Sequence, residues 1–327
     1  MISVTLLDLG TKSEGHRRHY AAFFGRLFKL TQPAGYLRGV LSRQPVLVPM
    51  IEDAFGKYLV AAMVRSALGR PTAGLLFRPL PAVEGRTLRL RSKYWLLRAL
   101  RLLPRVHTLT IVPFKADPRF AEIADDWIHD PQLWDLYDAP QRANSAVATV
   151  IREAARGRQV CVALGRQDRS KGFDWLAALY TRNAPLRDSV LFAFGGKVAE
   201  ALREQASALV SAGAYGRDET LDDSDLFAFY DAADLVWCAY ARDYDQASGI
   251  FGRAVQLGIP VVVRQGSLIH RLCVLEDIRH LAIAEHDSWE ALLSPTARES
   301  IETTHQRTLH MRTESVRRLH NALGIGA

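Results

Sequence analysis

Residues Asp243–Arg264 read DYDQASGIFGRAVQLGIPVVVR, and they say more about the architecture of the chain than any other segment. The pattern predicts an acidic loop, a short helix that begins near Ser248 and Gly249, a break at 258–260 and a buried strand of β-branched residues. Free backbone N–H groups and the positive end of the helix dipole attract an anion at such a helix start. Two interpretations of this segment stay open: a phosphate-bearing ligand at the carboxyl edge of a parallel sheet, or a surface loop with an ordinary Ser cap.

The rest of the chain repeats this alternation of strands and helices. Helical patterns separate short apolar runs, which argues for a parallel sheet with helices on its faces. The two halves share the rhythm, so we expect two similar α/β domains over 1–140 and 141–305, followed by a C-terminal helix over 306–327. The Asp- and Trp-rich stretch 117–140 is expected to be the crossover or linker between the domains. The predicted strands cover 2–9, 45–50, 73–77, 108–113, 159–164, 189–194, 235–239 and 260–264.

The bulk composition is that of an ordinary soluble globular protein. The chain has 327 residues, 48% of them hydrophobic and 24% charged, which is long enough for two α/β domains. Its formal net charge of +7 fits an anionic ligand, nucleic acid or a membrane surface as a partner. No apolar run approaches the length of a membrane-spanning helix, and no signal peptide is expected. Three cysteines without metal-binding spacing predict buried thiols in a reducing cytosol.

Three stretches of the second half carry a resemblance to a known family. They are 163–173 (ALGRQDRSKGF), 191–197 (LFAFGGK) and the segment 243–264, which FYDAADLV precedes at 229–236. In this order they resemble the nucleotide-binding half of GT-B glycosyltransferases, above all the large family that typically retains anomeric configuration and builds glycans and glycolipids. The resemblance covers about 160–264, and in the first half only Gly15-His16 is similar to the family.

The resemblance implies a GT-B fold, with two Rossmann-like domains facing across a cleft, and a site for the donor diphosphate. Arg166 offers a planar fork to phosphate oxygens and Lys171 offers a mobile point charge, although a solvated basic loop is the alternative. Glycines at a strand end allow close backbone approach, or simply a tight turn. The expected diphosphate-binding residues are Arg166, Lys171, Gly195, Gly196, Ser248, Gly249 and Ile250.

Two positions depart from the family pattern. The family usually has a Glu at the start of the acidic loop and a second Glu eight positions later, where this chain has Asp245 and Arg253. We expect Asp245 to be catalytic and Arg253 to lie in the donor pocket. Arg253 donates hydrogen bonds but accepts none, so it would bind a phosphate or pair with Asp243 or Asp245 rather than hold ribose hydroxyls. The departure leaves two outcomes open: an altered donor pocket, or an inactive site.

The first half supplies the expected acceptor side. His16 follows the first predicted strand and is expected to be catalytic, as a proton acceptor or hydrogen-bond donor toward the acceptor or the transferred sugar. The alternative for Gly15-His16 is a polar helix start. Arg78, at the end of the third predicted strand, is expected on the acceptor side together with Gly15.

A basic stretch over 86–105 suggests a membrane contact. It holds seven Lys or Arg and no Asp or Glu, interleaved with leucines and Trp95, and its helix is predicted over 93–103. This composition suits a helix on an anionic membrane surface, and the alternative is a core helix with one solvated basic face. We therefore expect a cytoplasmic protein that is peripheral on the inner face of the membrane.

The resulting functional hypothesis is a glycosyltransferase that moves a sugar from a nucleotide-sugar to a glycan or lipid-linked acceptor, in surface polysaccharide or exopolysaccharide assembly. One alternative is an epimerase or phosphorylase on the same scaffold. Another is a catalytically silent GT-B-like subunit that binds a glycan or a partner, which Arg253 favours. No helix-turn-helix, zinc or aromatic RNA motif points to nucleic acid. Neither a metal nor a cofactor is expected, since the nucleotide-sugar is a substrate.

Overall fold

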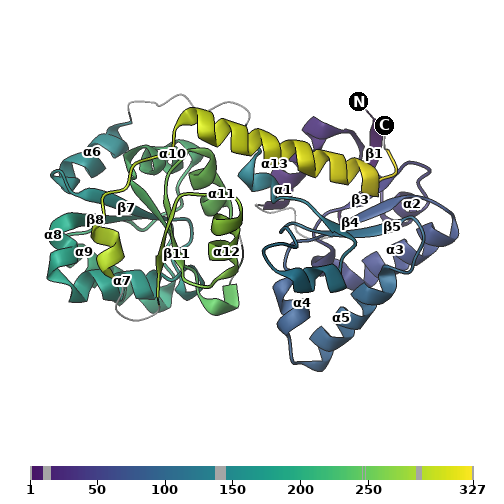
Figure 1. The fold of residues 1–327 in the computed structure, drawn as a ribbon, viewed down its shortest axis with the longest axis horizontal. Coiled ribbons are helices and arrows are strands. Elements are labelled where there is room, and N and C mark those ends of the chain that lie inside the picture. The colour runs from purple at the N-terminus through teal and green to yellow at the C-terminus, as the bar shows by residue number, and fades with distance from the viewer. Residues whose placement is uncertain are drawn as a thin grey trace. The chain divides into compact units, whose positions relative to one another are not determined.

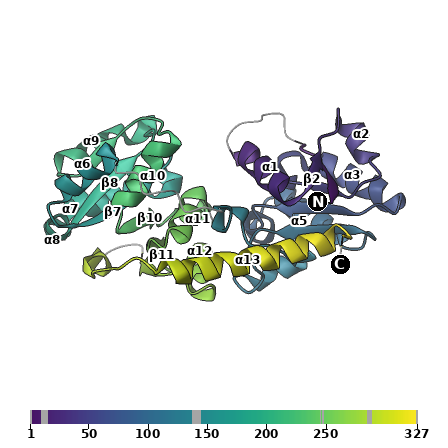
Figure 2. The ribbon, with the colours of Figure 1, turned by 90° about the horizontal axis from the view of Figure 1, so that it is seen from above.

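The computed structural model describes residues 2–9, 16–136, 145–244, 246, 248–284 and 289–325, without the side chains of 16–19. The chain divides into two compact units, Met1–Pro131 with Leu309–Ala327, and Gln132–Thr308. Within the described residues each unit holds a six-stranded parallel sheet between helices (Figures 1 and 2). The predicted α/β fold is thereby confirmed. The predicted boundary between 140 and 141 lies outside the described residues.

The first unit has the strand order β2-β1-β3-β4-β5-β6. Its central strands are fully buried, and β-branched or small residues dominate them, as in 46–48 (VLV) and 72–76 (TAGLL). The strands are β1 Ser3–Leu6, β2 Lys29–Thr31, β3 Val46–Val48, β4 Thr72–Leu76, β5 Val106–Thr110 and β6 Asp126–Trp127. The helices are α1 His16–Leu27, α2 Tyr36–Val40, α3 Phe55–Ala67, α4 Leu80–Glu84 and α5 Leu88–Leu100, with 3₁₀ turns η1 Ile51–Ala54, η2 Pro118–Glu122 and η3 Pro131–Leu133.

Helix α5 begins five residues earlier than the sequence predicted. The prediction began at Lys93, whereas the helix starts at Leu88. The Thr87 side chain accepts a hydrogen bond from the Leu90 N–H at 3.3 Å and caps the helix there. The N-cap, which the leucine pattern alone did not reveal, sets this boundary.

The long helix α13 (Ile301–Ala322) supplies the last part of the first unit (Figures 1 and 2). Its Ser315 hydroxyl accepts a hydrogen bond from the His129 N–H at 3.0 Å. Its Arg318 forms an ion pair with Asp126 and stacks 3.9 Å above the centroid of the Trp127 ring. These contacts fasten α13 to strand β6 and to the residues that follow it.

The second unit has the strand order β12-β11-β10-β7-β8-β9. Counted from β7, this is the 3-2-1-4-5-6 order of a dinucleotide-binding sheet, whose topological switch point lies between β7 and β10. The strands are β7 Gln159–Leu164, β8 Val190–Gly195, β9 Tyr215–Arg217, β10 Leu235–Cys238, β11 Val261–Arg264 and β12 His280–Ile283. The helices are α6 Ala146–Ala155, α7 Phe173–Arg182, α8 Ala184–Ser189, α9 Arg203–Ser211, α10 Asp223–Ala232, α11 Gly249–Gln256 and α12 Leu268–Leu275, with 3₁₀ turns η4 Arg169–Lys171, η5 Glu200–Leu202, η6 Arg242–Tyr244 and η7 Trp289–Leu293.

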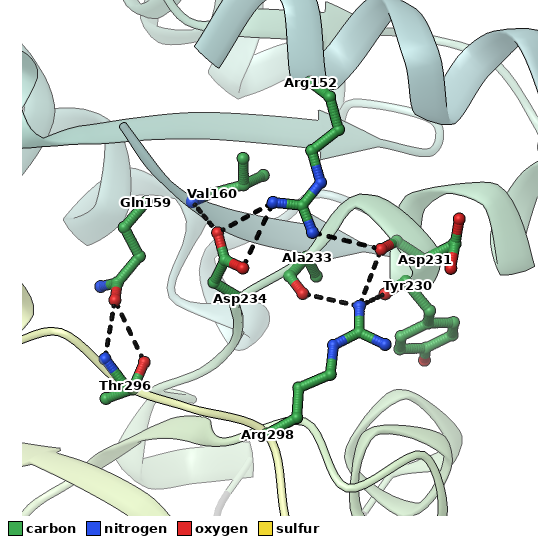
Figure 3. A network of polar contacts seen from close by, with 9 residues as sticks. All are labelled: Arg152, Gln159, Val160, Tyr230, Asp231, Ala233, Asp234, Thr296 and Arg298. Atoms are coloured by element: carbon green, nitrogen blue, oxygen red, sulfur yellow. Dashed lines mark hydrogen bonds and ion pairs between the residues drawn. The ribbon is translucent and has the colours of Figure 1, made fainter. Parts of the chain in front are cut away.

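A polar network fixes the step from α10 into β10 beside the switch point (Figure 3). The Asp234 carboxylate accepts a hydrogen bond from the Val160 N–H at 2.8 Å and pairs with Arg152 at 3.3 Å. The Arg298 guanidinium donates to the carbonyls of residues 230, 231 and 233, at 2.6 to 2.8 Å. These carbonyls lie at the C-terminal end of α10, where the helix itself leaves carbonyl groups unsatisfied. The residue 231 carbonyl also accepts a hydrogen bond from Arg152 at 3.4 Å. Asp234, which helped to reveal the family resemblance, therefore has a structural role.

The three cysteines are free and buried, as the sequence predicted. Burial raises the pKa of Cys238 to about 12, and it raises the pKa of Cys161 and Cys273 as well. These thiols stay protonated at neutral pH and act as core side chains.

Candidate functional site

Two glycine-containing turns touch at the carboxyl edge of the second sheet. The Gly165 N–H donates to the Gly195 carbonyl at 3.0 Å, and Gly196 has a φ of 130°. A Cβ atom on Gly196 would lie 1.9 Å from the Gly165 carbonyl oxygen, so only glycine fits there. A Cβ atom on Gly195 would instead meet the side chains of Leu221 and Phe229. The close backbone approach at this edge is thus made between the two turns themselves.

Gln167 holds the two turns together. It was not among the residues that the sequence predicted for the site. Its buried side-chain amide donates to the carbonyls of Ala163 at 3.1 Å, Gly165 at 2.8 Å and Gly195 at 3.3 Å. Its backbone N–H donates to the Lys197 carbonyl at 3.0 Å. Gln167 is a neutral residue in a polar loop, so no charge pattern in the sequence distinguishes it as a site residue.

A cavity of about 460 Å³ opens beside these turns, within the size range of small-molecule sites. Its walls combine apolar side chains with cations, a combination that suits a ligand with one apolar and one anionic part. Glu200 in the wall is neutralised by Arg203, at 3.0 Å. The lining residues include Gly165, Arg166, Gly196, Lys197, Leu221 and Ile250.

The predicted phosphate-binding pair occupies two different environments. The Arg166 side chain is 74% exposed, and its Nε lies 3.4 Å from the carboxylate of Asp168. Lys171 does not line the cavity. Its ammonium lies 4.2 Å from the ring centroid of Tyr240 and 4.4 Å from that of Tyr244. Asp168 links the two residues, since its carboxylate also accepts a hydrogen bond from the Lys171 N–H at 3.1 Å.

Helix α11 begins where the sequence predicted, and Ser248 is its N-cap. The Ser248 hydroxyl accepts a hydrogen bond from the Phe251 N–H at 3.4 Å and lies 2.6 Å from the Tyr240 hydroxyl. Burial raises the pKa of Tyr240 well above its ordinary value, so this hydroxyl stays neutral. Gly249 and Ile250 are the first two helical residues, whose N–H groups have no acceptor within the helix. Tyr240 therefore joins Lys171 to the start of α11.

Arg253 forms an ion pair with Asp135, a residue that the sequence had not suggested as its partner. The two side chains are only 21% and 11% exposed. Gln256 binds the same carboxylate at 3.1 Å. A Cβ atom on Gly252 would lie 2.2 Å from the Gln132 carbonyl oxygen, so α11 packs closely against 132–135. The sequence left two roles open for Arg253, binding a phosphate or pairing with Asp243 or Asp245. The structure pairs it with Asp135, which packs against the same face of α11, and Asp245 lies outside the described residues.

The first unit has a polar group at the carboxyl edge of its own sheet. Arg78 follows β4, and its backbone N–H donates to Glu52 Oε1 at 2.7 Å. Glu52 Oε2 is buried and has no hydrogen-bond partner among the described residues. Burial raises the pKa of Glu52 and lowers the pKa of Lys93, while each charge partly offsets the shift of the other. Met50, two residues before Glu52, has a left-handed φ of 51°.

Glu52 was not among the residues that the sequence predicted for this edge of the sheet. The available signal was a pair of acidic residues, Glu52-Asp53, immediately after the predicted strand 45–50. In the sheet order 2-1-3-4-5-6, the loop after β3 borders the switch point between β1 and β3, where ligands of such folds bind. An unpartnered buried carboxylate oxygen there is suited to accept a ligand hydroxyl.

Several predicted residues lie at the margin of what the structure describes. His16 is the first residue of α1, but its side chain lies outside the described residues. Gly15 and Asp245 also lie outside them. Within the described ranges, no group of three or more His, Cys, Asp or Glu side chains is placed to hold a metal ion. Over the same ranges, no helix is both long and apolar enough to cross a membrane.

The structure is similar to several solved sugar-transferring enzymes. It matches HepE from Anabaena, solved in complex with UDP and glucose, with 12% identity over 98% of this chain and 100% of HepE, at a TM-score of 0.60. It matches the α,α-trehalose 6-phosphate synthase of Burkholderia multivorans with 15% identity over 95% and 77% of the two chains, at 0.56. It also matches the catalytic domain of starch synthase IV from Arabidopsis thaliana, bound to ADP and acarbose, with 10% identity over 86% and 72%, at 0.54.

These likenesses concern the fold rather than the sequence. No family model and no curated protein sequence matches the chain. The structural matches extend over both units, each with its parallel six-stranded sheet. The chain therefore has the GT-B fold, as its sequence predicted.

Proposed function

We propose that the chain is a glycosyltransferase that takes a sugar from a nucleotide-sugar and transfers it to a glycan or lipid-linked acceptor. The observation that carries this proposal is the cavity of about 460 Å³ at the switch-point edge of the second sheet, lined by Arg166, Gly196 and Ile250. The bound UDP and glucose in HepE, and the ADP in starch synthase IV, support the same class of donor.

The chemistry of transfer assigns roles to the residues around this cavity. The leaving diphosphate gains negative charge in the transition state and needs cations and N–H donors in place beforehand. Arg166 and Lys171 supply the cations, and the start of α11 at Ser248–Ile250 supplies the N–H groups. Leu221 and Ile250 form the apolar wall against which the nucleobase packs.

The acceptor side belongs to the first unit in this proposal. His16 and Asp245 remain the proposed catalytic residues, and Gly15 and Arg78 the proposed acceptor-side residues. Glu52 joins them because its free carboxylate oxygen suits a sugar hydroxyl. The proposed setting is surface polysaccharide or exopolysaccharide assembly, in the cytoplasm and peripheral to the membrane.

One observation favours a second candidate, a catalytically silent GT-B-like subunit that binds a glycan or a partner. Arg253 replaces a carboxylate that the family uses, and it is already paired with Asp135. The donor pocket then lacks an acceptor for ribose hydroxyls at this position.

The first experiment identifies the donor by thermal shift with UDP-, GDP-, ADP- and dTDP-sugars. A ligand that binds only the native state raises the Tm by mass action. We expect one nucleotide to stabilise the protein above the others. Absence of stabilisation by every sugar nucleotide would refute the donor site. Release of radiolabelled sugar to an acceptor or to water then marks an enzyme, whereas saturable binding without turnover marks the silent subunit.

The site itself is tested by the double variant Arg166→Ala/Lys171→Ala. Loss of two charge-assisted contacts should weaken nucleotide-sugar binding roughly 100-fold in calorimetry. Arg169→Ala is the matched control, because it removes from the same turn an exposed cation to which the proposal gives no contact with the diphosphate. Equal affinities of the double variant and the control would contradict the assignment.

A further inference from the structure

The exposed apolar side chains of this protein are concentrated in one part of the first unit. Among the described residues, ten of the seventeen exposed large hydrophobic side chains lie within 36–105, although this range is about a fifth of the chain. We propose that the outer face of α2, α3 and α5, called here the three-helix face, docks on an anionic lipid bilayer. This proposal does not depend on the proposed sugar transfer.

Helix α3 is apolar on both of its sides. Its inner side is buried at Tyr58, Ala61 and Ala62. Its outer side exposes Val60, Met63, Val64 and, one residue past its end, Leu68, each between 36% and 53%. The outer side of a surface helix in water normally carries polar residues. The outer side of α3 instead has the composition of a surface that meets another apolar phase.

Helix α5 adds an apolar line flanked by arginines. Leu88, Trp95 and Leu102 are spaced by seven residues, so they recur on one side of the helix and its last turn. They are 82%, 60% and 84% exposed. Arg89, Arg91, Arg98 and Arg101 lie beside this line, while Leu97 and Leu100 face the core. Leucines with an aromatic ring between basic residues are typical of a helix in the interfacial plane of a membrane.

Helix α3 lies between α2 and α5 in the first unit (Figure 1). The Tyr36 hydroxyl of α2 donates to the Lys57 carbonyl of α3 at 2.7 Å. The Lys93 ammonium of α5 lies 5.5 Å from the centroid of the Phe55 ring of α3. Val40, Tyr58 and Leu97 share one buried core cluster beneath the helices. Their outer sides therefore form one surface, which α2 extends with the exposed Leu37 and Leu41.

Charge identifies the partner of this surface. Residues 36–105 hold thirteen Lys or Arg, of which Arg65 is fully buried, against three Asp or Glu. One of the three, Glu84, is paired with Arg119 at 2.9 Å, and another, Glu52, is largely buried. Arg98 pairs with Glu122, and Arg101 pairs with Asp125. Among the described residues, neither Arg89 nor Arg91 forms an ion pair. A second copy would bring like charges together, whereas an anionic bilayer brings opposite ones.

The test is co-sedimentation of the full chain with vesicles of phosphatidylcholine containing 30% phosphatidylglycerol, compared with pure phosphatidylcholine. At low salt, we expect binding to the anionic vesicles to be at least about tenfold stronger than binding to pure phosphatidylcholine vesicles. Binding to the anionic vesicles should fall in 0.5 M NaCl, because screening weakens the contacts of the basic side chains with the lipid. Quenching by brominated lipids should report insertion of Trp95, and the quenching should drop in Trp95→Phe.

Three variants separate the components of the surface. Met63→Ser/Trp95→Ala removes apolar contacts, Arg89→Glu/Arg91→Glu reverses charge, and each should weaken vesicle binding about tenfold or more. Val150→Ser/Val210→Ser removes two exposed valines of the second unit and should leave binding unchanged. All these side chains are exposed, so thermal melts should agree within a few degrees. The proposal would be overturned if Met63→Ser/Trp95→Ala and Arg89→Glu/Arg91→Glu bound vesicles as strongly as the wild type. A dimer in analytical ultracentrifugation that Met63→Ser/Trp95→Ala abolishes would also overturn it. The donor-binding measurements fail or succeed independently of these results.

Discussion

Two neighbouring parts of the second unit carry the family-like motif, and their arginines are used differently. After β7, Arg166 is 74% exposed beside the cavity, and its contact with Asp168 is open to solvent. On α11, Arg253 is mostly buried in an ion pair with Asp135. A motif cation is available to a ligand only where the protein has not already paired it with a buried carboxylate. The guanidinium of Arg166 is thus accessible from solvent beside the cavity, whereas that of Arg253 contributes to the packing of α11.

The backbone contact on the Arg166 side gives the largest expected effect. Gly196→Ala would place a Cβ atom 1.9 Å from the Gly165 carbonyl oxygen at a φ of 130°. We expect the free energy of unfolding to fall by about 3 kcal/mol in urea titrations, together with a loss of sugar-nucleotide binding. Gly213→Ala is the matched control, because its φ is 97° with no atom within 4 Å of the added Cβ. Its cost should be about 1 kcal/mol. Equal losses in both variants would mean that the two turns do not touch.

The second prediction concerns the ion pair on α11. Arg253→Ala leaves the poorly exposed Asp135 carboxylate without its cation, so we expect a loss of about 2 kcal/mol in unfolding free energy. Asp135→Asn in the Arg253→Ala background should restore part of the lost unfolding free energy. A double-mutant cycle measures the coupling between the two residues. Nucleotide-sugar affinity should stay within about twofold. A large loss of affinity with unchanged stability would instead place Arg253 in the donor pocket.

The smallest effect concerns the first unit, where Glu52 Oε2 has no hydrogen-bond partner among the residues that the structure describes. Burial raises the pKa of Glu52 above its ordinary value of 4.5, so the folded chain keeps this proton at a pH where the unfolded chain has lost it. The carboxyl therefore costs stability as the pH rises above 4.5, and the full cost is reached above the folded pKa. The unfolding free energy of Glu52→Gln relative to wild type should therefore rise as the pH is raised above 4.5. Glu84→Gln, which alters an exposed side chain, should show no such trend, and a flat curve for Glu52→Gln would contradict the raised pKa.

The central strands of both sheets were predictable, and the edge strands were not. All eight predicted strands correspond to strands of the structure, because buried central strands are continuous apolar runs such as QVCVAL at 159–164. The strands that the sequence did not reveal are β2, β6, β9 and β12, which lie at the sheet edges. They are two to four residues long and partly exposed, as in DW at 126–127 and YGR at 215–217. Such segments are strands because a neighbour offers hydrogen bonds, which local sequence does not show.

The candidate site was predictable only where chemistry is local. Arg166, Gly196 and Ile250 line one cavity, and each had been singled out by its position in a sequence motif. The contacts of Arg253 with Asp135 and of Gln167 with three carbonyls depend on the fold, since the first pair is separated by 118 residues. A residue type in a motif therefore predicts a location, whereas its partners decide its role.

Helix α13 has a consequence for the order in which the protein is built. Its Arg318 and Ser315 complete the packing around β6, yet they follow the whole second unit in the chain. A ribosome making this protein releases every strand of the second sheet before the first unit can close. The sheet of the second unit can therefore form before α13 completes the first unit, whose three-helix face leaves the exit tunnel early in synthesis.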